Sequence, residues 1–310
     1  MQQNQPRTMG ILEWLLLILL SILWGGSFFF SKVAVAELPP LTLVLCRVSI
    51  SAIALNLYVV FTGQRMPFSG KTWVGFIVLG MLNNLIPFSL IFWGQTQIPS
   101  GLASILNAST PVWAVLLAHF FTKGEHLTAN RTAGVLLGLS GVIIMLGPDL
   151  LQTLGLNLLA QLAVVGAGVS YAFGGFFGER IKGIPPLITA TGQVTCSSIL
   201  MVPIVLLIDK PWQISLPGLT TLGAVLALAL LSTAVAYLIY FRLLTSSGAT
   251  NLMLVTLLIP VSALLLGIII LGERLDPRHF LGMGFIGLGL AAIDGRLFPL
   301  LRKKLLPASH

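Results

Sequence analysis

The segments "KGEHLTANRTAG" (residues 123–134) and "LGERLDPRHFLG" (residues 271–282) carry one pattern twice, 148 residues apart. Gly124, Glu125, Leu127 and Gly134 match Gly272, Glu273, Leu275 and Gly282. Upstream, "PVWAVLL" from Pro111 matches "PVSALLL" from Pro260, and downstream Gly141 matches Gly289. Self-similarity over such a distance indicates that the chain is built from two copies of one unit.

The composition predicts that both copies lie in a membrane. Hydrophobic residues make up 56% of the 310 residues and charged residues only 8%, which is too little polar surface to cover a water-soluble fold. Apolar runs of about 20 residues recur, each long enough for a membrane-crossing helix. The ten runs are 11–36, 41–61, 73–93, 100–121, 130–147, 157–180, 185–208, 217–242, 248–271 and 278–297. The alternating pattern of a membrane β-barrel is missing, so we predict an all-α integral membrane protein.

Five runs fall in each copy, so the second copy must cross the membrane in the opposite sense. The predicted fold is therefore ten transmembrane helices in two inverted five-helix repeats, residues 11–147 and 157–297, with short tails at 1–10 and 298–310. Inverted repeats are a recurring plan of secondary transporters, which bind their substrate near the bilayer midplane where the repeats meet.

Basic residues predict the orientation. With the N-terminus in the cytoplasm, twelve of the 17 Lys and Arg residues fall on the cytoplasmic side, which satisfies the positive-inside rule and places both termini there. The first run has no cleavage site after it, so we expect a membrane span rather than a removed signal peptide. The basic residues lie at the ends of spans instead of forming a patch, which argues against nucleic acid as a partner.

The first halves of the copies also match, more weakly. "ILWGGSFFF" (22–30) is similar to "GVSYAFGGFF" (168–177), with Trp24 near Tyr171. Together with the repeated Pro-Val and Gly-Glu-x-Leu elements, this arrangement resembles the drug/metabolite transporter superfamily, and within it the ten-helix EamA-type exporters. The resemblance implies export of small hydrophobic or zwitterionic metabolites, such as aromatic amino acids, from the bacterial cytoplasm across the inner membrane by alternating access. We expect a monomer in the lipid bilayer, with a small-molecule substrate and no cofactor.

Polar side chains within spans are candidates for contact with that substrate, because each needs a partner in the bundle or a wet cavity. Asn84 shares a helical face with Ile91 and Gln95. Asn107 lies one turn before Pro111, which removes a backbone hydrogen bond there. Thr256 takes the place of Asn107 in the second copy, and Tyr237 lies on one side of span eight. Local repair of the backbone or helix packing is the alternative reading of each.

Aromatic residues within the spans predict the class of substrate. Trp24, Trp93, Trp113 and Tyr171 can form the wall of a cavity, although filling contacts between helices is an equally good reading. An aromatic wall without a fixed charge suits a neutral, zwitterionic or hydrophobic solute better than a phosphorylated one. A nucleotide-sugar transporter of the same superfamily should instead place Lys or Arg in its cavity.

Three prolines mark the predicted moving parts. Pro87, Pro111 and Pro260 lie within spans, where they let helices bend. The charged turn itself is predicted to be structural: Gly272 lets one helix stop, Asp276 caps the next and Pro277 begins it. Glu125 and Glu273 then hold their turns by bonding backbone N–H groups or a nearby Arg.

Titratable residues decide whether a proton is coupled to transport. Glu13 is a candidate proton carrier or an acid at a helix N-terminus, and His119 is a candidate or an interfacial histidine. We expect Arg47 to snorkel outward, or to help gate the outer mouth. A facilitator needs none of them, so proton-coupled transport of drugs or other metabolites stays open. The histidines and acids are scattered and Cys46 and Cys196 lie in apolar spans, which predicts no catalytic residue, metal site or disulfide.

Overall fold

The computed structural model describes residues 9–121, 129–151, 156–178, 180–181, 183–252 and 254–294. Within these residues the chain is helical and contains no strand, so the all-α prediction is confirmed for them. Glu125, residues 1–8 of the predicted N-terminal tail and the whole predicted tail at 298–310 lie outside the described residues.

The helices follow one another with short connections. In chain order they are α1 (Ile11–Ala34), α2 (Pro40–Phe61), α3 (Gly70–Gly80), η1 (Met81–Leu85), α4 (Ile86–Gln95), α5 (Ser100–Asn107), α6 (Thr110–Phe121), α7 (Ala129–Leu151), α8 (Leu156–Gly178), α9 (Pro186–Ile208), η2 (Pro211–Gln213), α10 (Leu219–Ala229), η3 (Leu230–Val235), α11 (Ala236–Leu252), α12 (Val255–Leu271) and α13 (Pro277–Asp294). The elements η1 and η3 are π-helical turns, and η2 is a short 3-10 helix.

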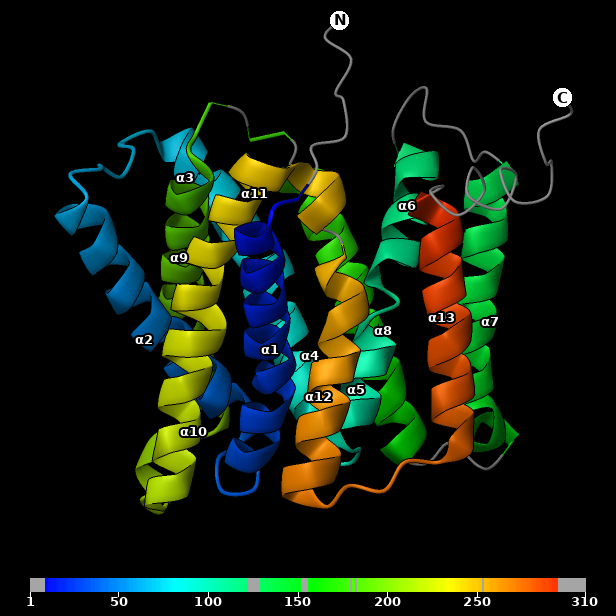
Figure 1. Cartoon of the computed structure of the whole chain (residues 1–310). Coiled ribbons are helices and arrows are strands. Elements are labelled where there is room, and N and C mark those ends of the chain that lie inside the picture. The colour runs from blue at the N-terminus through cyan, green and yellow to red at the C-terminus, as the bar shows by residue number, and fades with distance from the viewer. Residues whose placement is uncertain are drawn as a thin grey trace, which may run out of the picture.

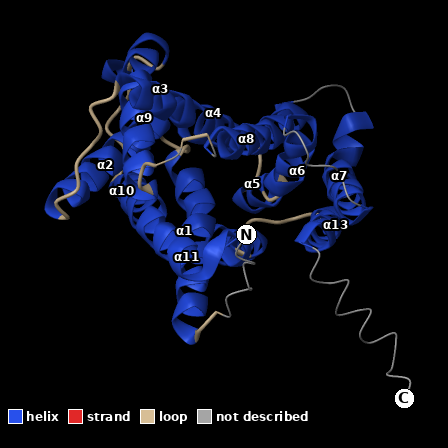
Figure 2. Cartoon of the chain, turned by 90° about the horizontal axis from the view of Figure 1, so that it is seen from above, coloured by secondary structure: helices blue, strands red, loops and turns tan. Residues whose placement is uncertain are grey.

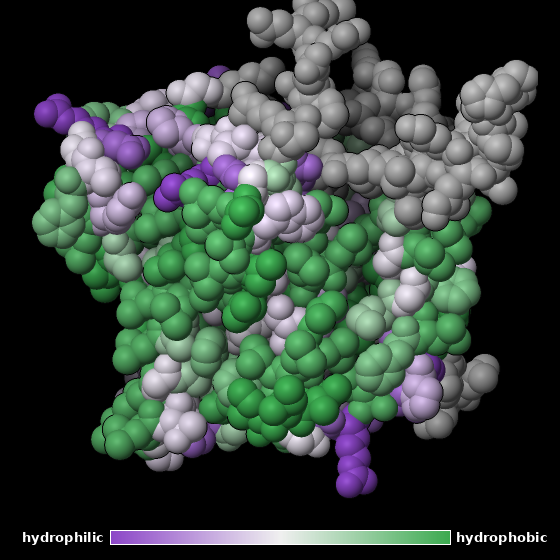
Figure 3. Space-filling view, in the orientation of Figure 1, coloured by the Kyte–Doolittle hydropathy of each residue, from purple (hydrophilic) through white to green (hydrophobic). Residues whose placement is uncertain are grey.

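Seven helices, some of them made of two or three consecutive elements, are long and apolar enough to cross a membrane. Three shorter apolar helices, Thr132–Ile144, Val255–Leu271 and Pro277–Ile293, complete the set of described apolar helices. Each apolar run predicted from the sequence overlaps one of these helices. The surface agrees with a membrane setting, because on the face that Figure 3 shows, apolar residues cover the middle of the molecule and hydrophilic residues lie toward its two ends.

The long helices stand side by side along a common direction (Figure 1). The pairs in closest contact are α1 with α12, α2 with α9, α4 with α8 and α7 with α13. Viewed from above, α6, α7 and α13 form one side of the molecule, and α2, α3, α9 and α10 form the other (Figure 2). The start of α1 and the end of α13 lie at the same end of the bundle, which we call the first end (Figure 1).

The two π-helical turns interrupt the third and eighth apolar runs at matching places. Pro87 follows η1, and because proline has no N–H and its ring crowds the carbonyl four residues earlier, the N–H of Ile86 bonds five residues back, to Met81. No proline accompanies η3. There the Thr233 hydroxyl donates to the Leu228 carbonyl, also five residues back, at 3.1 Å.

Serine hydroxyls from neighbouring helices bond the backbone at both turns. The Ser197 hydroxyl of α9 donates to the Gly80 carbonyl at 3.0 Å, and the Ser51 hydroxyl of α2 donates to the Ala229 carbonyl at 2.8 Å. Ser170 of α8 donates to the Leu82 carbonyl at 2.8 Å. The π turns are therefore stabilised from outside their own helices.

The other two predicted hinge prolines differ in setting. The fourth apolar run is broken, since α5 ends at Asn107 and α6 begins at Thr110, with Pro111 as its second residue. Pro260 lies inside the continuous helix α12. The role of all three prolines in movement stays a prediction.

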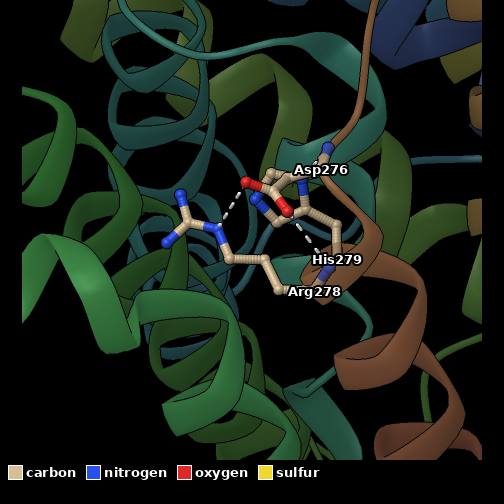
Figure 4. A network of polar contacts seen from close by, with 3 residues as sticks. All are labelled: Asp276, Arg278 and His279. Atoms are coloured by element: carbon tan, nitrogen blue, oxygen red, sulfur yellow. Dashed lines mark hydrogen bonds and ion pairs between the residues drawn. The ribbon is translucent and has the colours of Figure 1, made fainter.

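The turn between α12 and α13 has the predicted structure. Gly272 ends α12 with a left-handed φ of 64°. The Asp276 carboxylate accepts a hydrogen bond from the backbone N–H of Arg278 at 3.3 Å, and Pro277 is the first residue of α13. His279 and Arg278 fold back onto Asp276 (Figure 4). The backbone N–H of Asp276 donates to His279 Nδ1 at 3.2 Å, and Arg278 Nε lies 3.4 Å from the Asp276 carboxylate.

Four glycines set the contact between α7 and α13. A Cβ atom on Gly134 would lie 2.6 Å from the Gly289 carbonyl oxygen, and one on Gly141 would lie 2.6 Å from the Gly282 carbonyl oxygen. The two helices are thus antiparallel and too close for any side chain at these points. The repeat aligns Gly134 with Gly282 and Gly141 with Gly289, so each pair joins the first glycine of one copy to the second glycine of the other.

Replacing Gly289 with Ala tests this contact. The new methyl group would meet backbone atoms of Gly134 and Gly138, so we expect overpacking to cost about 1–3 kcal/mol and to lower the melting temperature in detergent. Gly287→Ala is the matched control in the same helix, because a Cβ there meets nothing within 4 Å and Ala favours the helix. Equal melting temperatures for the two variants would contradict the close approach of α7 and α13.

Candidate functional site

A cavity of about 660 Å³ lies inside the bundle. This volume is within the range of small-molecule sites in proteins, roughly 300–1,000 Å³. Its walls come from both halves of the chain. The first half contributes residues of α1 to α6, and the second half contributes residues of α8, α9, η3, α11 and α12. None of the lining residues in the described part of the chain belongs to α7 or α13.

The cavity reaches the first end of the bundle. Its lining on α8 runs from Tyr171 to Gly178, and continues through Ile181 and Ile184 in the connection to α9. At the opposite end, no residue of the four described connections, 35–39, 96–99, 209–218 and 272–276, lines it. In the described part of the chain the cavity therefore extends to the first end of the bundle, called the open end below, and stops short of the opposite end, called the closed end.

Five of the predicted substrate contacts line this cavity, together with the predicted hinge Pro111. They are Trp24, Asn107, Tyr171, Tyr237 and Thr256. They come from α1, α5, α8, α11 and α12, so residues that are far apart in the sequence face one space. The Oδ1 atom of Asn107 is buried and has no hydrogen-bond partner among the described residues.

The other three predicted contacts do not line the cavity. Asn84 is fully buried behind it, where its Nδ2 donates to the Ser197 hydroxyl at 3.1 Å. Trp93 is 38% exposed on the outside of the bundle. Trp113 donates from its indole Nε1 to the Ser109 hydroxyl at 3.1 Å and lies against Gly168 of α8.

Asn83 takes the place that regular helical spacing predicts for Asn84. The lining residues on this run are Leu79, Asn83, Phe88, Ile91 and Phe92, so the spacing widens to five residues between Asn83 and Phe88, across η1. A π turn holds one residue more than an α-helical turn, which shifts the preceding face by one position. Pro87 is the sequence signal that locates such an irregularity, but its effect on the register is not apparent from the sequence.

Asn83 and Asn84 belong to one chain of polar contacts. Asn83 Nδ2 donates to Gln193 Oε1 at 3.1 Å, and Gln193 Nε2 contacts the Tyr237 hydroxyl at 3.4 Å. That hydroxyl lies 3.5 Å from Asn84 Oδ1. The chain connects η1 to α9 and α11, so the irregular turn of one repeat is joined to helices of the other.

The side chain of Arg47 does not point in the direction that the sequence predicts. The prediction that it snorkels outward is wrong, because the side chain is 6% exposed and lines the cavity. Its Nε donates to the Thr233 hydroxyl at 3.0 Å, and its guanidinium carbon lies 3.7 Å from the centre of the Phe88 ring. The Arg47 side chain thus contacts a hydroxyl, an aromatic face and the cavity inside the bundle, and does not reach the membrane surface.

The expectation of an aromatic wall without a fixed charge is therefore wrong as well. Among the described residues that line the cavity, Arg47 is the one charged side chain. The aromatic part of the wall is present: Trp24 and Tyr240 lie with ring centroids 5.5 Å apart, and Tyr240 and Phe241 are 5.2 Å apart edge to face. The site combines large apolar faces, several hydroxyl and amide groups and a single cation.

The closed end is tied together by Glu273 and Lys32. The Glu273 carboxylate accepts the backbone N–H groups of Ser100 and Gly101 at 2.6 and 3.0 Å, so it binds the first turn of α5 rather than its own turn. Lys32 of α1 donates to the carbonyls of Gln95 and Ile98 at 2.6 and 3.0 Å. These bonds connect α1, α4, α5 and the turn after α12.

The two candidate proton carriers lie elsewhere. Glu13 accepts the backbone N–H of Gly10 at 3.0 Å, the position of an acid at a helix N-terminus. His119 lies beside the Phe120 ring near the end of α6. Neither lines the cavity. Among the residues the structure describes, no three His, Cys, Asp or Glu side chains gather as metal ligands.

Comparison with known proteins identifies the family. The sequence pattern of the EamA-like transporter family matches residues 11–147 and again 158–293. The chain is 26% identical over 286 residues to the probable amino-acid metabolite efflux pump of Escherichia coli, covering 89% of this chain and 92% of that one. It is 25% identical over 293 residues to the uncharacterized inner membrane transporter YedA of the same bacterium, covering 91% of each.

Other relatives agree. An uncharacterized transporter of Archaeoglobus fulgidus is 26% identical over 280 residues, covering 90% of this chain and 97% of that one. A solved crystal structure superposes with a TM-score of 0.63 at 19% identity, covering 90% of this chain and 96% of the other, which shows a shared fold. These relatives are named as transporters and not as enzymes. The chain is a multi-pass membrane protein that belongs to the EamA-like transporter family.

Proposed function

We propose that this protein exports small hydrophobic or zwitterionic metabolites, most simply aromatic amino acids and similar compounds, across the bacterial inner membrane. The observation that carries the proposal is the aromatic-walled cavity between the two halves, open to one end of the bundle. The efflux pump of Escherichia coli among its relatives is named for amino-acid metabolites. A likeness to YddG, a bacterial exporter of aromatic amino acids, belongs to the same proposal.

The proposal includes ten spans in two inverted repeats. The antiparallel pairing of α7 with α13 supports it, because equivalent glycines of the two copies exchange places in the contact. The π turns support it too: Ser197 of α9 bonds Gly80 before η1, and Ser51 of α2 bonds Ala229 before η3. A two-fold axis in the membrane plane would interchange these pairs.

Transport by alternating access follows from this symmetry. The open end carries the start of α1, and the positive-inside rule places it in the cytoplasm, with both termini there. The present cavity is then inward-open, and the Glu273 and Lys32 bonds close the outer side. We propose that these bonds break as α1, α5 and α12 separate, while the cytoplasmic mouth closes. The π turns and Pro87, Pro111 and Pro260 are the proposed points of bending.

Counterflow in liposomes tests the function. Purified protein is reconstituted with unlabelled tryptophan or phenylalanine inside, and uptake of the labelled amino acid is followed. We expect transient accumulation above equilibrium, which liposomes without protein do not show. Absence of counterflow with folded, monomeric protein in the membrane would contradict aromatic amino acids as substrates.

Trp24→Leu tests the aromatic wall. Loss of the indole face and of its contact with Tyr240 should raise the half-saturating phenylalanine concentration roughly 3- to 10-fold. Trp212→Leu is the matched control, because Trp212 is 67% exposed in η2 and does not line the cavity. An equal change of the half-saturating concentration in both variants, or no change in Trp24→Leu, would show that Trp24 does not contact the substrate.

Facilitated transport is the proposed mode, because no Asp, Glu or His is among the described residues that line the cavity. Counterflow should therefore proceed at the same rate with and without a pH gradient across the liposome. Double replacement of Glu13 and His119 by Gln should leave that rate unchanged. Net substrate accumulation driven by the gradient alone would show that the protein is a proton antiporter.

A further inference from the structure

Arg47 is a buried cation that has no counter-charge among the described residues of the cavity. It is 6% exposed, and none of the lining residues in the described part of the chain is Asp or Glu. Within the described part of the chain its recorded partners are the Thr233 hydroxyl and the rings of Phe88 and Phe92. A buried charge is costly unless it is paired, so such a group in a membrane span points to a ligand.

The guanidinium has donors left for that ligand. Its Nε is bonded to Thr233, and its face lies over Phe88, which orients the planar group. The two terminal nitrogens make no hydrogen bond with any described residue, and Arg47 faces the cavity. Their N–H groups are directed as a fork, the geometry that binds both oxygens of a carboxylate.

The rest of the cavity limits which anion fits. A phosphate ester carries about two negative charges, and a single guanidinium with neutral neighbours neutralises only one. A monocarboxylate matches the charge of Arg47 and leaves none over. The rings of Trp24, Tyr240 and Phe241 then form an apolar region for the body of the same molecule.

We propose that Arg47 binds the carboxylate of the substrate, and that the cavity selects aromatic or apolar monocarboxylates. The proposal rests on the transport function proposed above and names its substrate class more narrowly. It also extends that class beyond amino acids, because the described lining residues include no acidic side chain that would pair with an ammonium group. The unbonded Asn107 Oδ1 is a neutral acceptor, which can take an N–H of the ligand but adds no charge.

Three ligands that differ only in their charged groups test this selectivity by calorimetric titration of the detergent-purified protein. Phenylalanine has a carboxylate and an ammonium, 3-phenylpropanoate only the carboxylate, and phenethylamine only the ammonium. We expect the first two to bind with dissociation constants within about 10-fold of each other, and phenethylamine at least roughly 30-fold more weakly. Phenethylamine binding as tightly as phenylalanine would overturn the proposal.

Variants of Arg47 assign the effect to this residue. Arg47→Gln should weaken 3-phenylpropanoate binding roughly 10- to 100-fold, and should strengthen phenethylamine binding because the like charge is gone. Arg47→Lys should fall between wild type and Arg47→Gln, since it keeps the charge without the fork. Arg180→Gln is the matched control: Arg180 also stacks on a ring, 4.6 Å from Phe176, but it is exposed and does not line the cavity.

The reversal of preference separates binding from a structural role, because loss of packing alone would weaken both ligands. If Arg47→Gln does not fold, as judged by gel filtration and melting temperature, the wild-type ligand series and Arg47→Lys still test whether Arg47 binds the carboxylate. Equal affinity of Arg47→Gln and wild type for 3-phenylpropanoate would overturn the assignment. Failure of all three ligands to bind wild type, together with absent counterflow, would instead contradict the proposed function itself.

Discussion

In the hydrocarbon core of a bilayer, backbone N–H and C=O groups must be bonded within the protein, because no water is present to bond them. Three departures of this chain from regular α-helix adjoin the cavity: η1, η3 and the break between α5 and α6. At η1 and η3, side chains from other helices bond nearby carbonyls, as Ser197 does at Gly80 and Ser51 at Ala229. The irregular backbone thus exists where the two halves meet, and it shapes the cavity there.

The same constraint explains how much the sequence can predict. Apolar runs of spanning length, the repeated Gly-Glu-x-Leu turn and the capping residues of α13 act locally or through composition, so the helical membrane fold and the turn at Gly272 to Pro277 could be predicted. Asn83 could not, because the extra residue in η1 changes which asparagine faces the cavity. Arg47 could not either, because its inward direction depends on Thr233 and Phe88, which lie on other helices.

These two residues change the chemistry expected of the site. Aromatic residues at span centres predict an apolar wall, which the structure has. The fixed charge of Arg47 is the basis of the proposed preference for a carboxylate, and the hydropathy pattern does not predict it. A single cation beside aromatic rings combines charge matching at one end of a small molecule with burial of apolar surface at the other. The closed end adds no charge to this space, since Glu273 and Lys32 are engaged with backbone groups of α4, α5 and the connection between them.

We propose that one cavity is reached from the two faces of the membrane in turn. Ala108 lines the cavity beside the break between α5 and α6, and Cys46 and Cys196 are the only native thiols to replace. With both replaced, Ala108→Cys can be labelled by a membrane-impermeant maleimide in right-side-out and inverted vesicles. We predict labelling from the cytoplasmic face, slower labelling from the outer face, and protection from both by substrate. Labelling from one face only, under all substrate conditions, would contradict alternating access.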